Sequence, residues 1–410
     1  MSVNGREYAA PRRPTVVVCL DGTNAAYLEA AAAAGAAPFL ARLLKPESCL
    51  EVSSVVPSLT NPNNVSIVTG VPPAIHGISG NYFRDREQDA EVLMNSPAYL
   101  RTETILSAFS RAGFRVAAVT AKDKLRLLLG HKLQGICFSA ECASSANLPE
   151  NGIADVPKFV GLPEPSVYSE EISVFVLQAG LRLLEADRPD LMYLSTTDYV
   201  QHKFAPGSAE ANRLFATFDP LLRRMHELGA ALVLTADHGM SAKTNPDGTP
   251  RCLYLTPFLD NLLGQGAARV VLPITDPYVT HHGALGSFAS LYLAEPFRAG
   301  PKQLELVRKL ALLPGVEQVH DNREASARFN LPSDRLGDIV VLADGGTVLG
   351  KDEKSHDLSL LDRPLRSHGG LAESRVPLLS NGALSPTADL RHNYDAFYAA
   401  LNAASFDSAG

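Results

Sequence analysis

Four uninterrupted apolar runs, each followed by charged or polar residues, constrain the fold of this chain more than any other feature. They are TVVVCL at 15–20, RVAAVT at 115–120, DLMYLST at 190–196 and ALVLTA at 231–236. Runs of this kind are typical of strands that are buried on both faces of a parallel sheet. In such sheets the ligand crevice lies at the carboxyl ends of the strands. The side chains that follow these runs are therefore the first candidates for a functional site.

Helical patterns separate the predicted strands, as at 169–187 and 210–229, and an alanine-rich segment at 25–37 is predicted to be a further helix. Strands that alternate with helices predict an α/β fold in which helices cover both faces of a mostly parallel central sheet. The chain has 410 residues, which is more than one ordinary domain needs. We therefore expect one large core with an insertion, or two domains.

The second half of the chain contains short strands between turn-rich connections. Strands are predicted at 287–293, 316–320 and 338–344, with a helix at 302–313. We expect residues 251–359 to form a smaller α+β cap, inserted into a metal-binding catalytic core made of residues 1–250 and 360–410. The core is predicted to end with a strand near 377–382 and a last helix.

Several carboxylates and imidazoles follow the predicted core strands. Asp198 and His202 are four residues apart, which places them on one face of a helix start, able to hold one metal ion. Taken singly, Asp198 could be a helix cap and His202 a surface residue, and Asp21 after the first strand could also be a cap. Together with Asp237, His238 and His368, these residues can form two sites that leave positions open for water or substrate. Oxygen and nitrogen ligands without thiolate favour catalytic zinc, with manganese or iron as alternatives.

Thr60 is the candidate nucleophile, because it stands just before a helical run in the segment PSLTNPNN. A hydroxyl at a helix N-terminus has backbone N–H groups directed at an incoming anion, and a metal ion beside the oxygen would lower its pKa. The alternative for an isolated threonine here is a simple helix cap.

As a set, these motifs resemble the alkaline phosphatase superfamily, and within it the nucleotide pyrophosphatase/phosphodiesterase branch. The matching segments are LDG at 20–22, PSLTNPNNVSIVTGVPPAIHGISGN at 57–81, TTDYVQH at 196–202, ADHG at 236–239 and SHGG at 367–370. The resemblance implies an alkaline-phosphatase-like α/β/α sandwich with a smaller insertion, and hydrolysis through a phosphothreonine on Thr60. It implies two zinc sites, formed by Asp198, His202 and His368 and by Asp21, Thr60, Asp237 and His238. Asn81 matches the position that donates a hydrogen bond to the phosphoryl oxygen.

Lys122 and Lys124 lie just beyond the second core strand and give an indication of the substrate class. Both could reach the crevice and bind a small dianion that carries a second acid group, or they could form a solvated basic turn. The pair resembles the arrangement in members of this branch that cleave a carbon–phosphorus bond and hold the substrate carboxylate with lysines. His281 and His282 could also reach the substrate, or could belong to a polar loop of the cap, so we leave them out of the catalytic set.

Two other functions stay open. A nucleotide pyrophosphatase or phosphodiesterase with the same ligands would need an aromatic slot for a base, and the chain has no Trp and 7% aromatic residues. A non-catalytic phosphoester-binding protein would have no use for Thr60 or for a full set of metal ligands.

Composition narrows the partners and the location. With 37 basic and 44 acidic residues, the net charge of −7 argues against nucleic acid or an anionic membrane surface as a general partner. No apolar stretch approaches the roughly 18 residues of a membrane span. The start of the chain has no hydrophobic signal core, and the five cysteines form no CxxC pair, so we expect buried free thiols in a reducing cytoplasm. A homodimer is implied by the resemblance alone.

Overall fold

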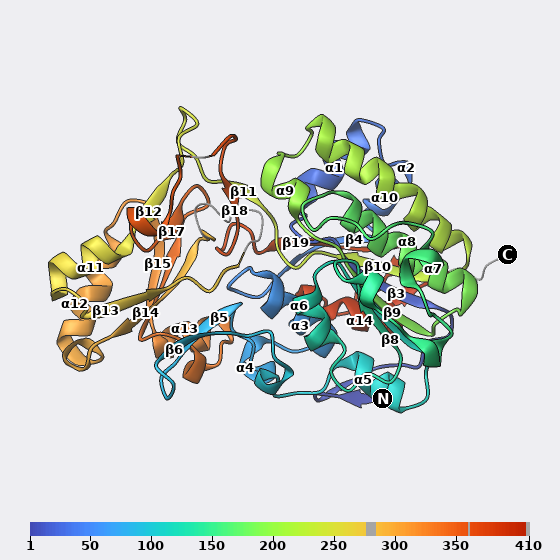
Figure 1. Cartoon of the computed structure of the whole chain (residues 1–410), viewed down its shortest axis with the longest axis horizontal. Coiled ribbons are helices and arrows are strands. Elements are labelled where there is room, and N and C mark those ends of the chain that lie inside the picture. Colours follow the sequence, from blue (N-terminus) through green and yellow to red (C-terminus); the bar gives the residue numbers. More distant parts are fainter. Residues whose placement is uncertain (276–283, 360, 407–410) are drawn as a thin grey trace.

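The computed structural model describes residues 1–275, 284–359 and 361–406, and its larger part is built on a seven-stranded sheet (Figure 1). In sheet order the strands are β4 (Cys49–Ser53), β19 (Arg375–Ser380), β10 (Ala231–Thr235), β3 (Thr15–Cys19), β9 (Leu191–Ser195), β7 (Val116–Thr120) and β8 (Ile136–Ser139). β19 is antiparallel to both of its neighbours, and every pair from β10 to β8 is parallel. The four predicted core strands are confirmed as β3, β7, β9 and β10, and they lie side by side.

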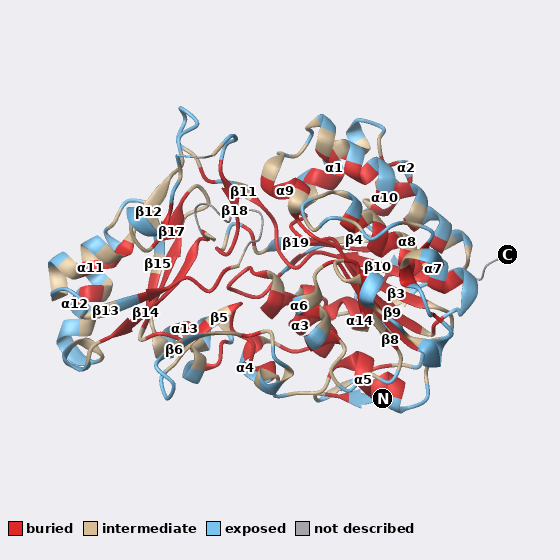
Figure 2. Ribbon diagram, in the orientation of Figure 1, coloured by how far each residue is buried: buried red, intermediate tan, exposed pale blue. Residues whose placement is uncertain are grey.

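Both faces of this sheet are buried, which explains why its strands have continuous apolar sequences. Along β3, Val16 and Val18 pack into one hydrophobic core, whereas Val17 and Cys19 pack into another. The first core is completed by α1 (Ala25–Ala33), α2 (Pro38–Leu43), α8 (Glu171–Ala186) and α10 (Ala209–Glu227). The second is completed by α3 (Thr60–Thr69), α5 (Ile105–Arg111), α6 (Asp123–Leu129) and α14 (Ala396–Tyr398). Figure 2 shows the buried strands between helices with exposed outer faces, which confirms the predicted α/β/α sandwich.

A smaller antiparallel sheet lies at the other end of the molecule, on the left in Figure 1. Its order is β13 (Ala268–Val271), β14 (Phe288–Leu293), β16 (Ile339–Ala343) and β15 (Val316–Asp321). The helices α11 (Leu255–Leu263) and α12 (Gly300–Ala311) pack on one face and α13 (Asn322–Phe329) on the other. The predicted strands and helix of this region are confirmed, while the cap boundaries at 251 and 359 stay a prediction.

The two parts of the chain meet through several short elements. The chain leaves the large sheet through β11 (Ser241–Ala242) and returns through β18 (Arg366–Ser367), and these two strands pair with each other. A hairpin of β5 (Tyr82–Asp85) and β6 (Ala90–Leu93) lies against the smaller sheet, where the Arg84 N–H donates to the Tyr292 hydroxyl at 3.2 Å. Further short elements elsewhere in the chain include α4 (Pro73–His76), α7 (Val156–Val160), α9 (Tyr199–Lys203), β12 (Cys252–Tyr254) and β17 (Val348–Gly350).

Two expectations from composition can be compared with the structure. All five cysteines are unpaired, but Cys19 alone among them is buried and the other four are half-buried, so the expectation of buried thiols holds for Cys19 and is wrong for the rest. Among the helices that the structure describes, none has both the length and the apolar character needed to cross a bilayer.

A buried ion pair joins the large sheet to the smaller one. The Lys243 ammonium lies 2.8 Å from Glu373 Oε1, and both side chains are 0% exposed. The same ammonium donates to Ser287 Oγ at 2.8 Å and to the Gly345 carbonyl at 3.0 Å, both of which adjoin strands on the smaller sheet's side. Glu373 Oε2 accepts the backbone N–H of Gly370 at 3.0 Å. The charged groups thus have partners on both sides of the junction.

We expect Lys243→Met to lower the free energy of unfolding by about 3–5 kcal/mol, because the Glu373 carboxylate would be left buried without its counter-ion. The measurement is urea unfolding followed by far-UV circular dichroism. Lys309→Met is the matched control, since Lys309 pairs with Glu305 on the exposed face of α12, where such pairs contribute about 0.3–0.5 kcal/mol. Equal effects of the two substitutions would show that the buried pair does not stabilise the junction.

Candidate metal centre and active site

The predicted ligands come together at the carboxyl ends of three neighbouring strands. Asp21 follows β3, Asp198 follows β9, and Asp237 and His238 follow β10, and these strands are adjacent in the order β10-β3-β9. The other ligands come from helix α9, which carries His202, and from the segment after β18, which carries His368. The six residues are between 0% and 9% exposed.

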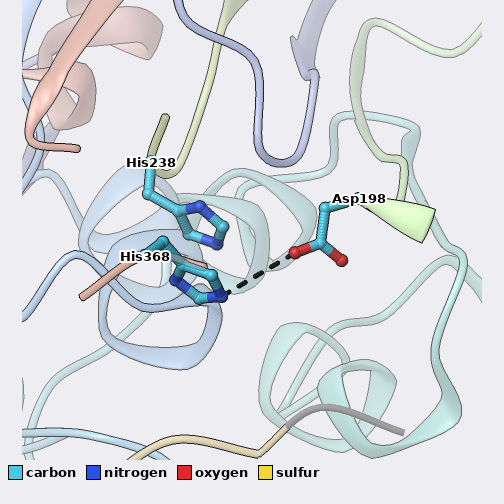
Figure 3. A group of neighbouring side chains, drawn as sticks. All are labelled: Asp198, His238 and His368. Atoms are coloured by element: carbon cyan, nitrogen blue, oxygen red, sulfur yellow. Dashed lines mark ion pairs between the residues drawn. The ribbon is translucent and has the colours of Figure 1, made fainter. Parts of the chain in front are cut away.

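Two overlapping groups of these side chains have the spacing of a metal site. Ligand atoms of Asp198, His238 and His368 lie within 4.8 Å of one another, and so do those of Asp21, Asp237 and His238. Figure 3 shows the first group, in which the His368 ring lies against the His238 ring and is directed at the Asp198 carboxylate. His202 Nε2 lies 3.0 Å from Asp198 Oδ2, so the structure brings together all six predicted ligands of this type.

The hydrogen bonds of the imidazoles suit metal ligation. Nδ1 of His202, His238 and His368 faces a backbone carbonyl oxygen, at 3.2, 2.9 and 2.8 Å. Because a carbonyl oxygen only accepts, each Nδ1 is the nitrogen that donates to it, and Nε2 is the nitrogen that faces the carboxylates. All three Nε2 atoms lie near carboxylates, at 3.0 to 3.8 Å. This second-sphere arrangement is typical of metal-binding histidines.

The three carboxylates are crowded, and their electrostatics favour a bound cation. Burial and the negative charges of Asp198 and Asp237 raise the pKa of Asp21 well above its usual range. Neither oxygen of Asp21 accepts a hydrogen bond from any residue in the described ranges. Burial acts in the same direction on Asp198, but Lys122 and His202 outweigh it and hold the pKa of Asp198 well below the usual range. Burial and the neighbouring His238 lower the pKa of His368. The donor set therefore fits one or more divalent cations.

Thr60 lies beside this cluster as the first residue of α3. The residue that caps the helix is Leu59, whose side chain makes no capping bond, so the alternative of Thr60 as a helix cap does not describe the structure. Thr60 Oγ1 lies 3.4 Å from His238 Nε2. The hydroxyl is thus placed at the edge of the Asp21, Asp237 and His238 group.

A cavity of about 610 Å³ opens in front of Thr60. Its lining includes the other predicted substrate-binding residues, Asn81, Lys122 and Lys124. Asn81 Oδ1 accepts the backbone N–H of Asn61 at 3.4 Å, which fixes the amide at the start of α3. The Lys122 ammonium lies 3.4 Å from Asp198 Oδ1, a contact with a predicted metal ligand that no sequence pattern indicates.

Sequence reasoning missed much of the cavity wall. Glu91 and Lys351 form an ion pair at 3.4 Å across it, and Thr275 accepts a hydrogen bond from Asn81 Nδ2 at 2.8 Å. These residues come from distant parts of the chain, and no local motif marks them. His281 and His282 lie outside the described residues.

The family described as type I phosphodiesterase / nucleotide pyrophosphatase matches residues 15–371, and the chain belongs to this family. Human ectonucleotide pyrophosphatase/phosphodiesterase family member 1 is 28% identical over 265 residues, which is 61% of this chain and 25% of that protein. The chain thus spans about a quarter of the length of that relative. A phosphonoacetate hydrolase from Penicillium oxalicum is 43% identical over 68 residues, covering 16% of this chain and 83% of that sequence.

Solved structures give a fuller match. The crystal structure of phosphonoacetate hydrolase from Sinorhizobium meliloti 1021 in complex with phosphonoacetate superimposes with a TM-score of 0.93 at 50% identity, over 98% of each chain. Murine ectonucleotide pyrophosphatase/phosphodiesterase 5 superimposes with a TM-score of 0.63 at 19% identity, over 94% of this chain and 93% of that one, and shares the fold.

His76 anchors the segment that leads to Asn81, and its environment predicts a pH effect. The imidazole is 0% exposed, its Nδ1 accepts the Ile78 N–H at 3.1 Å, and its Nε2 lies 2.8 Å from Ser66 Oγ. Burial, with a smaller effect of Arg335, lowers the pKa of His76 from 6.5 to about 3. Between pH 6.5 and about pH 3, His76 is therefore protonated in the unfolded chain but stays neutral in the folded chain.

We expect His76 to have no effect on the pH dependence of the free energy of unfolding above pH 6.5. Below pH 6.5 it should lower this free energy by about 1.4 kcal/mol per pH unit, down to about pH 3. Urea unfolding between pH 7 and pH 4 should show a shallower pH dependence for His76→Gln than for the wild type, because a glutamine side chain does not titrate. His131→Gln, at a half-buried position, should keep the wild-type slope. Identical slopes for all three proteins would refute the role of His76.

A second prediction follows from the crowded carboxylates. In chelator-treated protein, Asp21→Asn should leave the melting temperature unchanged or raise it, because one of three repelling charges is removed. In zinc chloride the wild type should be stabilised, by about 4 kcal/mol at 1,000 times Kd, and the variant much less. Thermal unfolding under both conditions measures the difference.

Asp219→Asn is the control for this experiment, because Asp219 is also a buried carboxylate but accepts the N–H groups of Phe39 and Leu40 at the start of α2. Its loss should lower the melting temperature equally with zinc and with chelator. An Asp21→Asn variant that gains as much from zinc as the wild type would argue against Asp21 as a ligand.

Proposed function

We propose that this chain hydrolyses the carbon–phosphorus bond of phosphonoacetate to acetate and phosphate, with two zinc ions and with Thr60 as nucleophile. The observation that carries the proposal is the match over 98% of the chain to a phosphonoacetate hydrolase crystallised with phosphonoacetate. The lysine pair on the wall of the cavity, next to the predicted nucleophile, supports the same substrate.

The metal ligands in this proposal are those of the predicted sites, with Asp198, His202 and His368 in one and Asp21, Thr60, Asp237 and His238 in the other. When bound, zinc would act as a Lewis acid that neutralises charge on the phosphoryl oxygens and favours the ionised form of a nearby hydroxyl. The protein itself orients these side chains: the Nδ1 hydrogen bonds to backbone carbonyls hold the three imidazole rings in place.

The chemistry of the leaving group gives the lysines their role. The Thr60 hydroxyl loses its proton to solvent as its oxygen forms a bond to phosphorus, and the electron pair of the carbon–phosphorus bond moves onto carbon. Because that carbon adjoins a carboxylate, the charge delocalises as an enolate-like dianion, which then takes up a proton to give acetate. The ammonium groups of Lys122 and Lys124 would stabilise the charge where it develops, which is differential binding of the transition state.

The remaining steps regenerate the enzyme. Asn81 Nδ2 donates one hydrogen to Thr275 Oγ1 at 2.8 Å, and its second hydrogen would be donated to a phosphoryl oxygen to hold it during the transfer. Water then attacks the phosphothreonine, releases phosphate and restores the Thr60 hydroxyl. The cytoplasmic location and the homodimer stay predictions.

Nucleotide pyrophosphatase or phosphodiesterase activity is the second candidate, favoured by the family match over residues 15–371 and by the similarity to the human relative. It uses the same metal ligands and the same nucleophile and differs in the leaving group. A comparison of substrates therefore separates the two functions.

The test is phosphate release by zinc-loaded protein from phosphonoacetate, phosphonopyruvate, aminoethylphosphonate and a nitrophenyl phosphodiester, with nitrophenol release also followed for the last. We expect phosphonoacetate to be strongly preferred and turnover to be lost in Thr60→Ala. Lys122→Ala should lose about 10²–10³ in rate, because an electrostatic contact to the developing charge disappears. Lys45→Ala, at an exposed lysine away from the cavity, should keep full turnover.

A strong preference for the diester would transfer the function to the phosphodiesterase candidate while keeping the metal site. Full turnover of phosphonoacetate by Lys122→Ala would reject the lysine role alone.

A further inference from the structure

We propose that Asn64 is a positioning residue that holds the Asp237 carboxylate and the first turn of α3 in register at the metal centre, an inference that rests on the proposed function. Asn64 is 0% exposed and lies one helical turn after Thr60. Its Nδ2 donates to Asp237 Oδ2 at 3.2 Å and to the Thr60 carbonyl at 3.0 Å. One amide group thus contacts both a predicted ligand and the backbone of the predicted nucleophile.

The orientation of the Asn64 amide is determined by its partners. Its Oδ1 accepts hydrogen bonds from the Tyr193 hydroxyl at 2.7 Å and from Ser195 Oγ at 2.8 Å, both on β9. The two atoms that face Nδ2 are a carboxylate oxygen and a carbonyl oxygen, and neither can donate. A flipped amide would place its own oxygen against both of them, so only the observed orientation satisfies all four contacts.

The two oxygens of the Asp237 carboxylate have different hydrogen-bond partners. Oδ1 accepts the backbone N–H groups of Gly22 at 3.3 Å and of His238 at 3.0 Å. Asn64 therefore completes the support of the carboxylate from the opposite side, and through β9 it links this carboxylate to the strand that leads to Asp198. Outer groups that orient a metal ligand in this way typically change metal affinity about 10–100-fold when they are removed.

Asn64→Asp tests the inference, because the substitution keeps the shape and an acceptor for Tyr193 and Ser195 but replaces the donating NH₂ by oxygen. Metal-free protein is titrated with zinc in competition with a chromophoric chelator. We expect zinc affinity to fall about 10–100-fold at one site. In the zinc-saturated enzyme, kcat should fall with little change in KM, because the alignment of Thr60 is lost and the cavity wall is intact.

Asn381→Asp is the matched control. Asn381 Nδ2 donates to the Ala230 carbonyl at 2.9 Å and its Oδ1 accepts the Leu232 N–H at 2.8 Å, at the opposite end of β10 from the site. Its substitution should lower the melting temperature without changing zinc affinity. If Asn64→Asp behaves like this control, the amide is structural and the inference is overturned.

A second variant keeps the inference testable if Asn64→Asp does not fold. Tyr193→Phe combined with Ser195→Ala leaves the amide in place but removes both hydroxyls that fix its orientation, so zinc affinity should fall by a smaller, measurable factor. Unchanged affinity would overturn the inference. A wild-type chain that binds no zinc would overturn the metal sites and the inference together, whereas a wild type that binds zinc only as tightly as Asn64→Asp would overturn the inference alone.

Discussion

Three carboxylates buried side by side are the constraint on which this site depends. Asp21, Asp198 and Asp237 follow three adjacent strands and are between 0% and 2% exposed. Like charges in a buried site repel strongly, and burial itself disfavours each charge. The structure offsets part of this repulsion with the Lys122 ammonium, which lies 3.4 Å from Asp198 Oδ1. The remaining negative charge is what a divalent cation would neutralise, so the crowding of the carboxylates fits the proposed metal site.

Much of this arrangement can be predicted from the sequence, because each part has a local signal. A strand buried on both faces has a continuous apolar sequence, and a residue just after a parallel strand lies at the ligand edge. For that reason the sequence alone places Asp21, Asp198 and Asp237 together. The alanine-rich segment 25–37, which Glu29 and Gly35 interrupt, is predicted to be a helix, and the structure has a helix only as far as Ala33. Gly35 follows with a φ of +68°, which ends the helical path before α2 begins.

The parts that cannot be predicted depend on long-range pairing. The hairpin of β5 and β6 precedes most of the large sheet in the chain, yet it lies against the smaller sheet, where Arg86 pairs with Asp338 at 2.8 Å. Asn64 shows the same limit at the site, since the segment TNPNN gives no reason to separate it from its neighbour Asn63. Only the positions of Thr60, Tyr193, Ser195 and Asp237 around it reveal four satisfied hydrogen bonds.

The charges of the cavity wall bear on the leaving group of the proposed reaction. Family membership indicates phosphoryl chemistry but does not determine the leaving group. The leaving group has to be inferred from the residues that line the cavity. Glu91 is engaged by Lys351, and Glu141 accepts the Asp123 N–H at 2.7 Å, so both acidic groups of the wall are already bound. Lys124 and Lys122, whose ammonium also lies 3.4 Å from Asp198 Oδ1, form the positive side of the cavity. Under the proposed function, the carboxylate next to the scissile bond would bind on this side. A leaving group that becomes more anionic during cleavage is stabilised most by such a wall, which is the requirement for breaking a carbon–phosphorus bond.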